Sequence, residues 1–212
     1  MKVIKDTRED KKMRIVEAAA RVFARNGFAR SLVSDIAREA DIGKGTVYEY
    51  FASKNELFFA VFEWFVEKMA TAAQDGAADF SGSASRRLEG MVASSMNAGV
   101  DMENFFSLSM EFWAASGSSQ MRVRFADAFR RAYENFRCTV VALIEEGKVR
   151  GEFKVDVDAS AVAAGLVGSL DGVFLQAWFD RSFDPVATAR SFTKWLVKGI
   201  KSEENVEETS MA

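Results

Sequence analysis

The stretch from Ser31 to Leu57 reads SLVSDIAREADIGKGTVYEYFASKNEL, and it decides the fold of this chain. Its first apolar residues recur at the i, i+3, i+4 and i+7 spacing of one helical face: Val33, Ile36, Ala37 and Ala40. Ser31 precedes this helix as the expected N-cap. The run Asp41-Ile42-Gly43 then interrupts the pattern, which predicts a tight turn.

A second short helix is predicted from Lys44 to Phe51, with Val47 and Phe51 on its apolar side. Ser53 and Glu56 have the spacing of a capping box, which starts a third helix. Two short helices across a tight turn are the layout of a helix-turn-helix, whose second helix enters the major groove of DNA by its N-terminal end.

The residues at the N-terminal end of this second helix are suited to contact DNA. Lys44 offers a cation to a phosphate or a guanine edge, and Gly45 allows the backbone to approach closely. Thr46 and Tyr48 carry hydroxyls that can bind phosphate oxygens. The spacing alone leaves another interpretation open, in which this is an ordinary helical corner with solvated polar residues.

The segment from about Met13 to Phe59 closely resembles the DNA-binding signature of the TetR family of bacterial transcriptional regulators. The matched positions include RNGF at the end of the preceding helix, DIA from Asp35, KGTVY from Lys44, and the YF and SK pairs that follow. Asp41 stands where the family usually has a turn glycine, and Gly43 stands where it usually has a capping serine. Aspartate tolerates turn geometry and glycine is an acceptable N-cap, so we carry over no side-chain phosphate contact at position 43.

The motif and the resemblance together predict a set of DNA-binding residues. They are Ser31, Lys44, Gly45, Thr46, Tyr48, Glu49, Tyr50 and Lys54.

The composition narrows the possible functions. The chain has 212 residues and no histidine, and this absence excludes Ser-His and Cys-His nucleophile pairs and histidine-based zinc sites. It has one cysteine, Cys138, so it cannot form an intrachain disulfide. No catalytic signature or phosphate-binding glycine loop is present, so we expect neither an enzyme nor a bound cofactor or metal. Carboxylate-only catalysis remains as a weaker alternative.

The sequence predicts a cytoplasmic protein. Its charged first residues lack the apolar core of a signal peptide, and the most apolar run, residues 159–179, is interrupted by Asp171 and Gln176. Residues 1–54 carry 12 Lys and Arg against 8 Asp and Glu, while the remainder carries 16 against 23. A basic N-terminal segment followed by an acidic remainder fits a protein that contacts DNA through its N-terminal part, although chance could also produce this charge distribution.

Helical periodicity continues along the whole chain, and no strand pattern of period two is present. We predict an all-α fold of about nine helices. A three-helix helix-turn-helix head is expected over residues 7–54, and a helical ligand-binding and dimerisation body over 55–201. Residues 202–212 are expected to form a disordered acidic tail. The predicted body helices cover residues 54–78, 85–98, 119–146, 159–179 and 185–200, and a further one runs from a cap at Asp101 through Trp113. Gly99 and Gly147 are expected to end two of them, Asp101 to cap one start, and Ala115 to Ser118 to form a turn.

Small residues form a stripe along the penultimate helix: Ala161, Ala164, Gly165, Gly168 and Gly172. Because each glycine costs about 1 kcal/mol of helix stability relative to alanine, the stripe indicates that another helix comes close. The resemblance implies that the last two helices pair with those of a second subunit. Tight packing within one chain is the alternative.

Aromatic and methionine side chains are abundant in the middle helices, where they could line an apolar chamber or simply fill the core. The resemblance implies a ligand pocket that governs DNA binding. The candidate ligand-binding residues are Phe62, Phe65, Met69, Met91, Ser95, Met96, Phe105, Phe106, Ser109, Met110, Trp113, Phe129, Tyr133, Asp171 and Phe174. An aromatic drug, a fatty acyl chain and a similar amphiphile all fit.

These observations predict a homodimeric, ligand-responsive DNA-binding transcriptional regulator, which acts as a repressor and leaves a palindromic operator when a hydrophobic small molecule binds. The expected partners are double-stranded operator DNA, this effector and a second copy of the chain, without a membrane. The alternative is a helical protein that binds an apolar ligand and has no DNA function, and an operator gel shift distinguishes the two.

Overall fold

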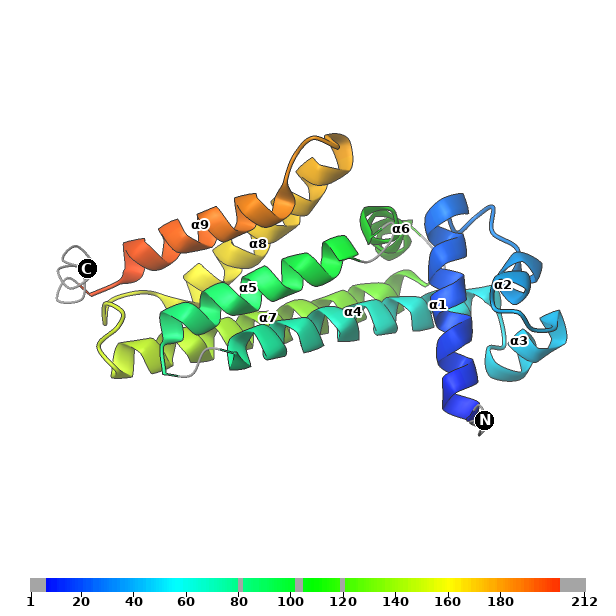
Figure 1. The fold of residues 1–212 in the computed structure, drawn as a ribbon, viewed down its shortest axis with the longest axis horizontal. Helices are drawn as coiled ribbons and strands as arrows, with labels where there is room; N and C mark the ends of the chain where they lie inside the picture. Colours follow the sequence, from blue (N-terminus) through cyan, green and yellow to red (C-terminus); the bar gives the residue numbers. More distant parts are fainter. Residues whose placement is uncertain (1–6, 80–81, 102–104, 119–120, 203–212) are drawn as a thin grey trace, which may run out of the picture. The chain divides into compact units, whose positions relative to one another are not determined.

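The computed structural model describes residues 7–79, 82–101, 105–118 and 121–202 of the chain. Within these ranges the protein is all helical, which confirms the predicted fold class (Figure 1). The helices are α1 (Arg8–Asn26), α2 (Val33–Glu39), α3 (Lys44–Tyr50), α4 (Lys54–Ala78), α5 (Ala84–Asp101), α6 (Phe105–Ser118), α7 (Arg122–Val149), α8 (Ala159–Phe179) and α9 (Pro185–Ile200). The predicted tail falls outside the described residues except for Ser202.

The chain divides into two compact units. The first contains residues 1–67 and 102–127, and the second contains residues 68–101 and 128–212. Helices α4 and α7 each begin in the first unit and continue into the second, so no flexible linker joins the units at these two places. The functional boundary that the sequence predicts after residue 54 lies inside the first unit, and it stays a prediction.

Three helices begin at side-chain caps. The Thr7 hydroxyl accepts a hydrogen bond from the Asp10 backbone N–H at 3.1 Å, and the Asp10 carboxylate accepts one from the Thr7 N–H at 3.0 Å. Asp158 accepts hydrogen bonds from the first turn of α8, and Asp184 accepts one from the first turn of α9, which has Pro185 at its start. Each cap satisfies backbone donors that have no partner within their own helix.

Several predicted helix ends are wrong, mostly because an interior glycine does not by itself stop a helix. Gly99 lies inside α5, which ends at Asp101, and the predicted cap by the Asp101 side chain lies outside the described residues. Helix α6 continues through the predicted turn at residues 115–118. Gly147 lies inside α7, which ends at Val149.

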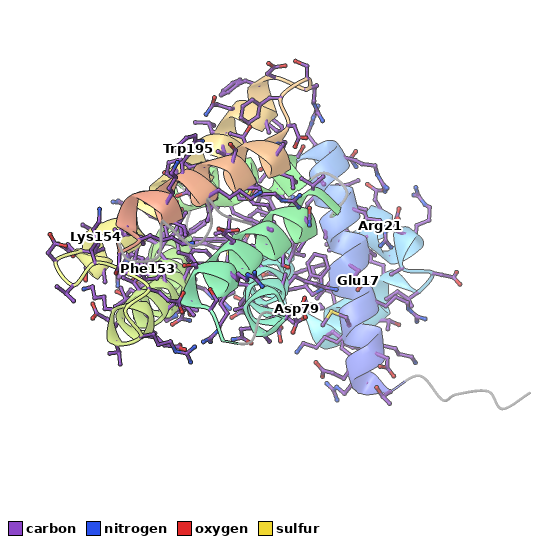
Figure 2. The ribbon with its side chains drawn as sticks, turned by 60° about the vertical axis from the view of Figure 1, so that its left-hand side comes forward. Glu17, Arg21, Asp79, Phe153, Lys154 and Trp195 are labelled. Carbon is purple, nitrogen blue, oxygen red and sulfur yellow. The ribbon has the colours of Figure 1, made fainter. Side chains whose placement is uncertain are left out.

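Close packing explains why position 147 holds a glycine. A Cβ atom there would collide with the ring of Phe153, which is 1% exposed and folds back into the second unit (Figure 2). The chain turns after α7 at Gly151, whose φ of 72° is in the left-handed region that favours glycine. Phe153 thus anchors the connection between α7 and α8 in the apolar core of the second unit.

Each unit has its own apolar core. In the first unit, Phe58 contacts Phe23, Phe112 and Phe125, with ring centroids 5.1–5.5 Å apart. In the second unit, the core joins helices α5, α7, α8 and α9 and includes Met91, Met96, Ile144 and Leu166. By length and composition alone, α8 could cross a membrane, and it is the one such helix in the described ranges.

Candidate nucleic-acid interface

The helix-turn-helix is held against α1 by apolar packing and by two ion pairs. Ile36 and Ala37 of α2 are buried, and Val47 of α3 is 1% exposed. Glu39 at the end of α2 accepts hydrogen bonds from Arg21 Nε at 2.8 Å and Arg25 Nη2 at 2.6 Å. These hydrogen bonds, from Arg21 first and Arg25 second, lower the pKa of the Glu39 carboxyl.

The turn between α2 and α3 has the geometry expected from its two unusual residues. Asp41 has a φ of 53°, which lies in the left-handed region. The family usually has a glycine at this turn position, and glycine adopts such a φ without strain. The Ile42 N–H reaches back to the Ala37 carbonyl oxygen at 3.0 Å. Gly43 is the N-cap of α3 and makes no side-chain cap, as expected for glycine.

The N-terminal end of α3 presents the predicted DNA-reading side chains to solvent. Lys44, Gly45 and Glu49 are exposed, Tyr48 is 47% exposed, and Thr46 is half-buried. A Cβ atom on Gly45 would meet no other atom within 4 Å, so the fold itself does not require a glycine there. This small residue leaves the helix surface open to close approach by a ligand such as DNA.

Tyr50 is positioned by a second element of the head. It is half-buried, and the Arg8 guanidinium carbon lies 5.5 Å from the centroid of its ring. This cation–π geometry brings the start of α1 next to the end of α3. Arg8 therefore adds an exposed positive charge near the predicted set.

Two predicted DNA-binding residues have contacts inside the head. Ser31 is 1% exposed, and its hydroxyl donates to the carbonyl oxygens of Val22 at 3.3 Å and Gly27 at 2.7 Å. The prediction that Ser31 caps α2 is wrong, because the N-cap is Leu32, which makes no side-chain cap. We therefore leave the Ser31 side chain out of the proposed interface.

Lys54 is the second of these residues. Its Nζ donates to the carbonyl oxygens of Phe28, Ala29 and Ser31, at 2.8, 3.3 and 3.0 Å. No local pattern predicts this role, because the carbonyl groups lie 23–26 residues earlier in the chain. A DNA contact by Lys54 stays a prediction.

The predicted ligand-binding residues fall into both compact units. In the first unit, Phe62 is 1% exposed and contacts Phe59, Phe112 and Phe125, while Phe65 packs on Phe112. Ser109, Met110 and Trp113 of α6 are half-buried. The side chains of Phe105 and Phe106 lie outside the described residues.

In the second unit, three of the predicted ligand-binding residues belong to the core of α5. Met91 and Met96 are fully buried, and the buried Ser95 hydroxyl donates to the Met91 carbonyl oxygen at 2.8 Å. Met69 and Phe174 are half-buried. Complete burial of Met91 and Met96 is what the core-filling interpretation predicts for these two side chains.

A polar pair links α7 and α8 in the same unit. The Tyr133 hydroxyl donates to Asp171 Oδ2 at 2.9 Å, and the Tyr133 ring stacks on Phe129 with centroids 6.1 Å apart. Burial raises the pKa of the Asp171 carboxyl, and the Tyr133 hydrogen bond partly opposes this effect. Asp171 lies on the otherwise apolar α8, and a contact of either residue with a ligand stays a prediction.

One face of α8 and α9 combines small residues with exposed apolar side chains. Ala161, Ala164, Gly165 and Gly168 are exposed, and a Cβ on either glycine would meet no other atom within 4 Å. The exposed large apolar residues of these two helices are Leu175, Phe179, Phe192 and Trp195, with 38%, 77%, 38% and 67% of their surface accessible. The small residues are thus not explained by tight packing within this chain, which was the alternative.

The described fold and the exposed end of α3 define a helix-turn-helix DNA-binding protein. Comparison with known proteins agrees with this class. Residues 15–61 match the family model of bacterial regulatory proteins of the tetR family, and residues 84–200 match the C-terminal model of BetI-type transcriptional repressors. The chain belongs to the TetR family of bacterial transcriptional regulators, as the sequence predicts.

Similar proteins cover nearly the whole chain. The fatty acid metabolism regulator protein of Bacillus subtilis is 26% identical over 199 residues, which are 91% of this chain and 97% of that protein. A TetR transcription regulator from Haloarcula marismortui superposes with a TM-score of 0.79 at 22% identity, over 92% of this chain and all of that one. FadR from Bacillus subtilis in complex with stearoyl-CoA superposes with a TM-score of 0.73 at 24% identity, over 89% and 98% of the two chains.

The family establishes the general function of this protein. It is a DNA-binding transcriptional regulator, and its relatives are regulators rather than enzymes. Regulators of this family bind operator DNA and small-molecule effectors and are typically dimers.

Proposed function

We propose that this protein is a homodimeric repressor that binds a palindromic operator and releases it when a hydrophobic effector binds. The observation that carries the proposal is the exposed N-terminal end of α3 opposite a buried Val47. Lys44, Gly45, Thr46 and Tyr48 are the proposed contacts to phosphates and base edges. Glu49 and Tyr50 border this surface and belong to the same proposed interface.

The second subunit is proposed to bind through α8 and α9. Exposed Phe179 and Trp195, together with small residues that let another helix approach, support an isologous four-helix contact. Such a dimer would present two copies of α3 to one face of the duplex, about one helical turn or a multiple of it apart. We place this complex in the cytoplasm, where the regulated DNA lies.

The proposed effector has a long apolar part. Two relatives bear on its chemistry, a fatty acid metabolism regulator and a FadR structure that contains stearoyl-CoA. A long-chain acyl thioester is therefore the first effector to test, and the predicted ligand-binding residues, including Met69, Trp113, Phe129 and Phe174, are its proposed contacts. Tyr133 and Asp171 are proposed to orient a polar group of the ligand.

The proposed switch is a shift between two arrangements of the dimer. Helix α4 runs without interruption from the helix-turn-helix unit into the second unit. An effector that binds one body arrangement more tightly would shift the population toward it, and α4 would carry the change to the spacing of the two heads.

DNA contact is tested with a duplex that the wild-type protein selects from a random library. Fluorescence anisotropy should show that Lys44→Ala weakens binding by about tenfold and lowers the salt slope by about 1, because one phosphate contact is lost. Arg86→Ala removes an exposed charge from α5 and serves as the matched control. An unchanged affinity and salt slope for Lys44→Ala would refute the assignment of α3 as the reading helix.

Effector control is tested on the same duplex. Stearoyl-CoA should reduce the affinity for DNA, whereas free coenzyme A should not, because only the former supplies an apolar chain. If the acyl thioester and DNA bind the dimer without mutual effect, the thioester is not the effector. The same measurement with a free fatty acid distinguishes the acyl chain from the nucleotide part.

A further inference from the structure

The outward face of α3 carries one acidic side chain, that of Glu49. Val47 is 1% exposed and marks the side of α3 that packs on the head. Each residue advances about 100° around an α-helix, so Gly45 and Glu49, two positions before and after Val47, both lie about 160° from it. Both are exposed. Because Gly45 has no side chain, the Glu49 carboxylate stands alone at the centre of this outward face.

The Glu49 carboxylate is free to accept hydrogen bonds. Within the described ranges of the chain it has neither a hydrogen bond nor an ion pair. The acidic residues of α2 differ from it in this respect. Asp35 lies 3.4 Å from Arg38, and Glu39 is bound by two arginines of α1. The lysine of α3, Lys44, lies five positions before Glu49, about 140° away around the helix.

A free carboxylate at a DNA interface has an electrostatic cost. Duplex DNA carries one negative charge for about every 1.7 Å of its axis, so Glu49 is repelled by every sequence to a similar extent. The repulsion is offset only where the carboxylate accepts a hydrogen bond from a base. Such a residue lowers the affinity for most sequences and thereby increases the discrimination between them.

Cytosine is the base whose major-groove edge best fits a carboxylate. Its N4 amino group is a donor without an acceptor beside it, whereas the N6 amino group of adenine lies next to the N7 acceptor. Guanine presents the N7 and O6 acceptors, and thymine presents the O4 acceptor and a methyl group. A carboxylate is repelled by each of these acceptors, since it is itself only an acceptor when ionised.

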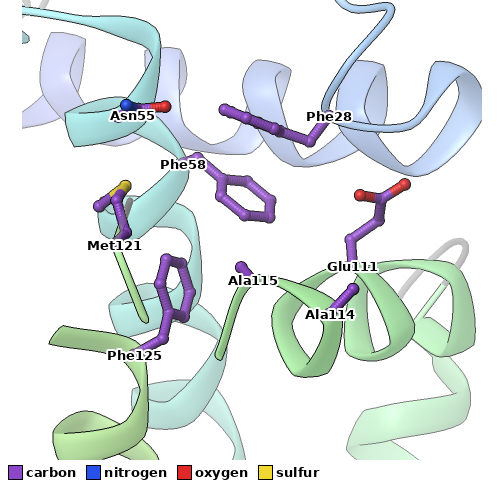
Figure 3. A pocket seen from close by; sticks show the side chains of 8 residues that line it. All are labelled: Phe28, Asn55, Phe58, Glu111, Ala114, Ala115, Met121 and Phe125. Atoms are coloured by element: carbon purple, nitrogen blue, oxygen red, sulfur yellow. The ribbon is translucent and has the colours of Figure 1, made fainter. Parts of the chain in front are cut away.

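The support under Glu49 is rigid, as discrimination between bases requires. A side chain that reads a base must be held to within about 0.5 Å. Phe51, just after α3, is 6% exposed, and its N–H donates to the Val47 carbonyl oxygen at 3.0 Å. At the start of α4, the Phe58 ring lies between those of Phe28 and Phe125, with centroids 4.4 and 5.5 Å away (Figure 3). Packed aromatic rings therefore fix the helix that follows α3.

We propose that Glu49 makes this regulator selective for a cytosine in each half of its operator, by accepting a hydrogen bond from the cytosine N4 amino group in the major groove. The inference rests on the proposed function, because it requires α3 to be the reading helix. Lys44 and Tyr48 supply affinity through phosphates, and Glu49 supplies discrimination. In the proposed dimer, the two copies of Glu49 read symmetry-related cytosines.

Selection from a randomised duplex library, followed by sequencing, tests the proposal. The wild type should select a motif with one required cytosine in each half-site, and replacing one of these cytosines should weaken binding by about tenfold. Glu49→Gln should select adenine at the same position, because a glutamine amide pairs with adenine N6 and N7. Glu49→Ala should accept all four bases there, and it should bind random-sequence duplex more tightly than the wild type because the repulsion is lost.

A base analogue tests the hydrogen bond itself. In 2-pyrimidinone, which replaces the selected cytosine in a synthetic duplex, the N4 amino group is absent. The wild type should bind this duplex about tenfold more weakly than the cytosine duplex, whereas Glu49→Ala should bind the two with equal affinity. Equal affinity of the wild type for both duplexes would overturn the proposal.

Asp41→Asn is the matched control. It removes an exposed carboxylate from the turn before α3, and asparagine tolerates the φ of 53° at this position, so the variant should select the wild-type motif. The inference alone fails if Lys44→Ala weakens binding but both Glu49 variants select the wild-type motif, or if the base that they change is not cytosine. If the wild type selects no motif and Lys44→Ala binds as tightly as the wild type, the proposed function fails and the inference fails with it.

Discussion

Lys54 Nζ lies 2.8 Å from the carbonyl oxygen of Phe28, which joins the first residue of α4 to the segment between α1 and α2. Two more carbonyl oxygens, those of Ala29 and Ser31, accept from the same ammonium group. These carbonyl groups have no helical partner of their own in the turn that leads to α2. Lys54 thus fixes the start of the helix that runs into the second compact unit.

Lys54→Met should destabilise the helix-turn-helix unit. The substitution keeps the apolar stem and removes all three donors, so we expect a loss of about 1–2 kcal/mol in the free energy of unfolding, which urea denaturation measures. Lys44→Ala is the matched control, because Lys44 is exposed and its loss should change DNA affinity but not stability. If Lys54→Met retains full stability and loses only DNA affinity, its role is the DNA contact predicted from the sequence.

Glu152 stabilises the start of α5 in a pH-dependent way. Its carboxylate accepts hydrogen bonds from the backbone N–H groups of Ala84 at 3.0 Å and Ser85 at 3.2 Å, and from the hydroxyls of Ser83 and Ser85. Burial by itself raises the pKa of Glu152, but these hydrogen bonds outweigh burial and lower it. The stabilisation is therefore complete above the unfolded-state pKa and is lost as the pH falls through the folded-state value.

Glu152→Gln should destabilise the protein by about 1 kcal/mol near neutral pH, the size of a lost helix cap. The difference from the wild type should shrink as the pH falls below the ordinary glutamate pKa of 4.5 toward the lowered folded-state pKa, because the wild-type carboxylate then becomes protonated. Urea denaturation over this pH range measures both effects. Glu145→Gln, at an exposed residue that pairs with Lys148, is the control, and a difference that does not change with pH would contradict the cap assignment.

Gly76 marks a close crossing of α4 and α5. A Cβ atom at this position would collide with the Gly90 backbone oxygen and would lie 2.5 Å from the Ser94 hydroxyl oxygen. Backbone atoms cannot move aside as a flexible side chain can, so Gly76→Ala should cost about 1–3 kcal/mol in thermal or urea unfolding. Gly45→Ala is the contrasting variant, because open space surrounds that position and alanine favours a helix by about 1 kcal/mol. Equal stability of the two variants would disprove the close crossing.

Local sequence patterns predicted much of the fold and less of the candidate sites. Asp158 and Asp184 were identifiable as caps because their hydrogen bonds reach only two or three residues along the chain. Gly147 was misinterpreted as a helix end because a glycine can lie inside a helix where a neighbour packs closely, and the sequence does not show that this neighbour is Phe153. Helix boundaries therefore depend partly on tertiary packing.

Long-range contacts account for what the sequence could not predict. Ser31 has the residue type of an N-cap, yet its hydroxyl is engaged by carbonyl groups of the α1 end. Glu152 contacts residues 67–69 positions earlier in the chain, and Glu111 lies against Gly27. No periodic pattern brings such residues together, so the sequence alone does not predict these contacts.

The proposed dimer contact predicts that Trp195→Glu produces a monomer. Trp195 is 67% exposed, and a carboxylate at the centre of an apolar helix–helix contact would have to be buried without a partner, at a cost of several kcal/mol. Sedimentation velocity should show a dimer for the wild type and a monomer for the variant. Val155→Glu is the matched control, since Val155 is 82% exposed in the connection before α8 and should leave the dimer intact. Because a monomer presents only one α3 to DNA, the Trp195→Glu variant should also lose most of its affinity for a palindromic duplex. If this variant remains a dimer, the subunit contact lies elsewhere.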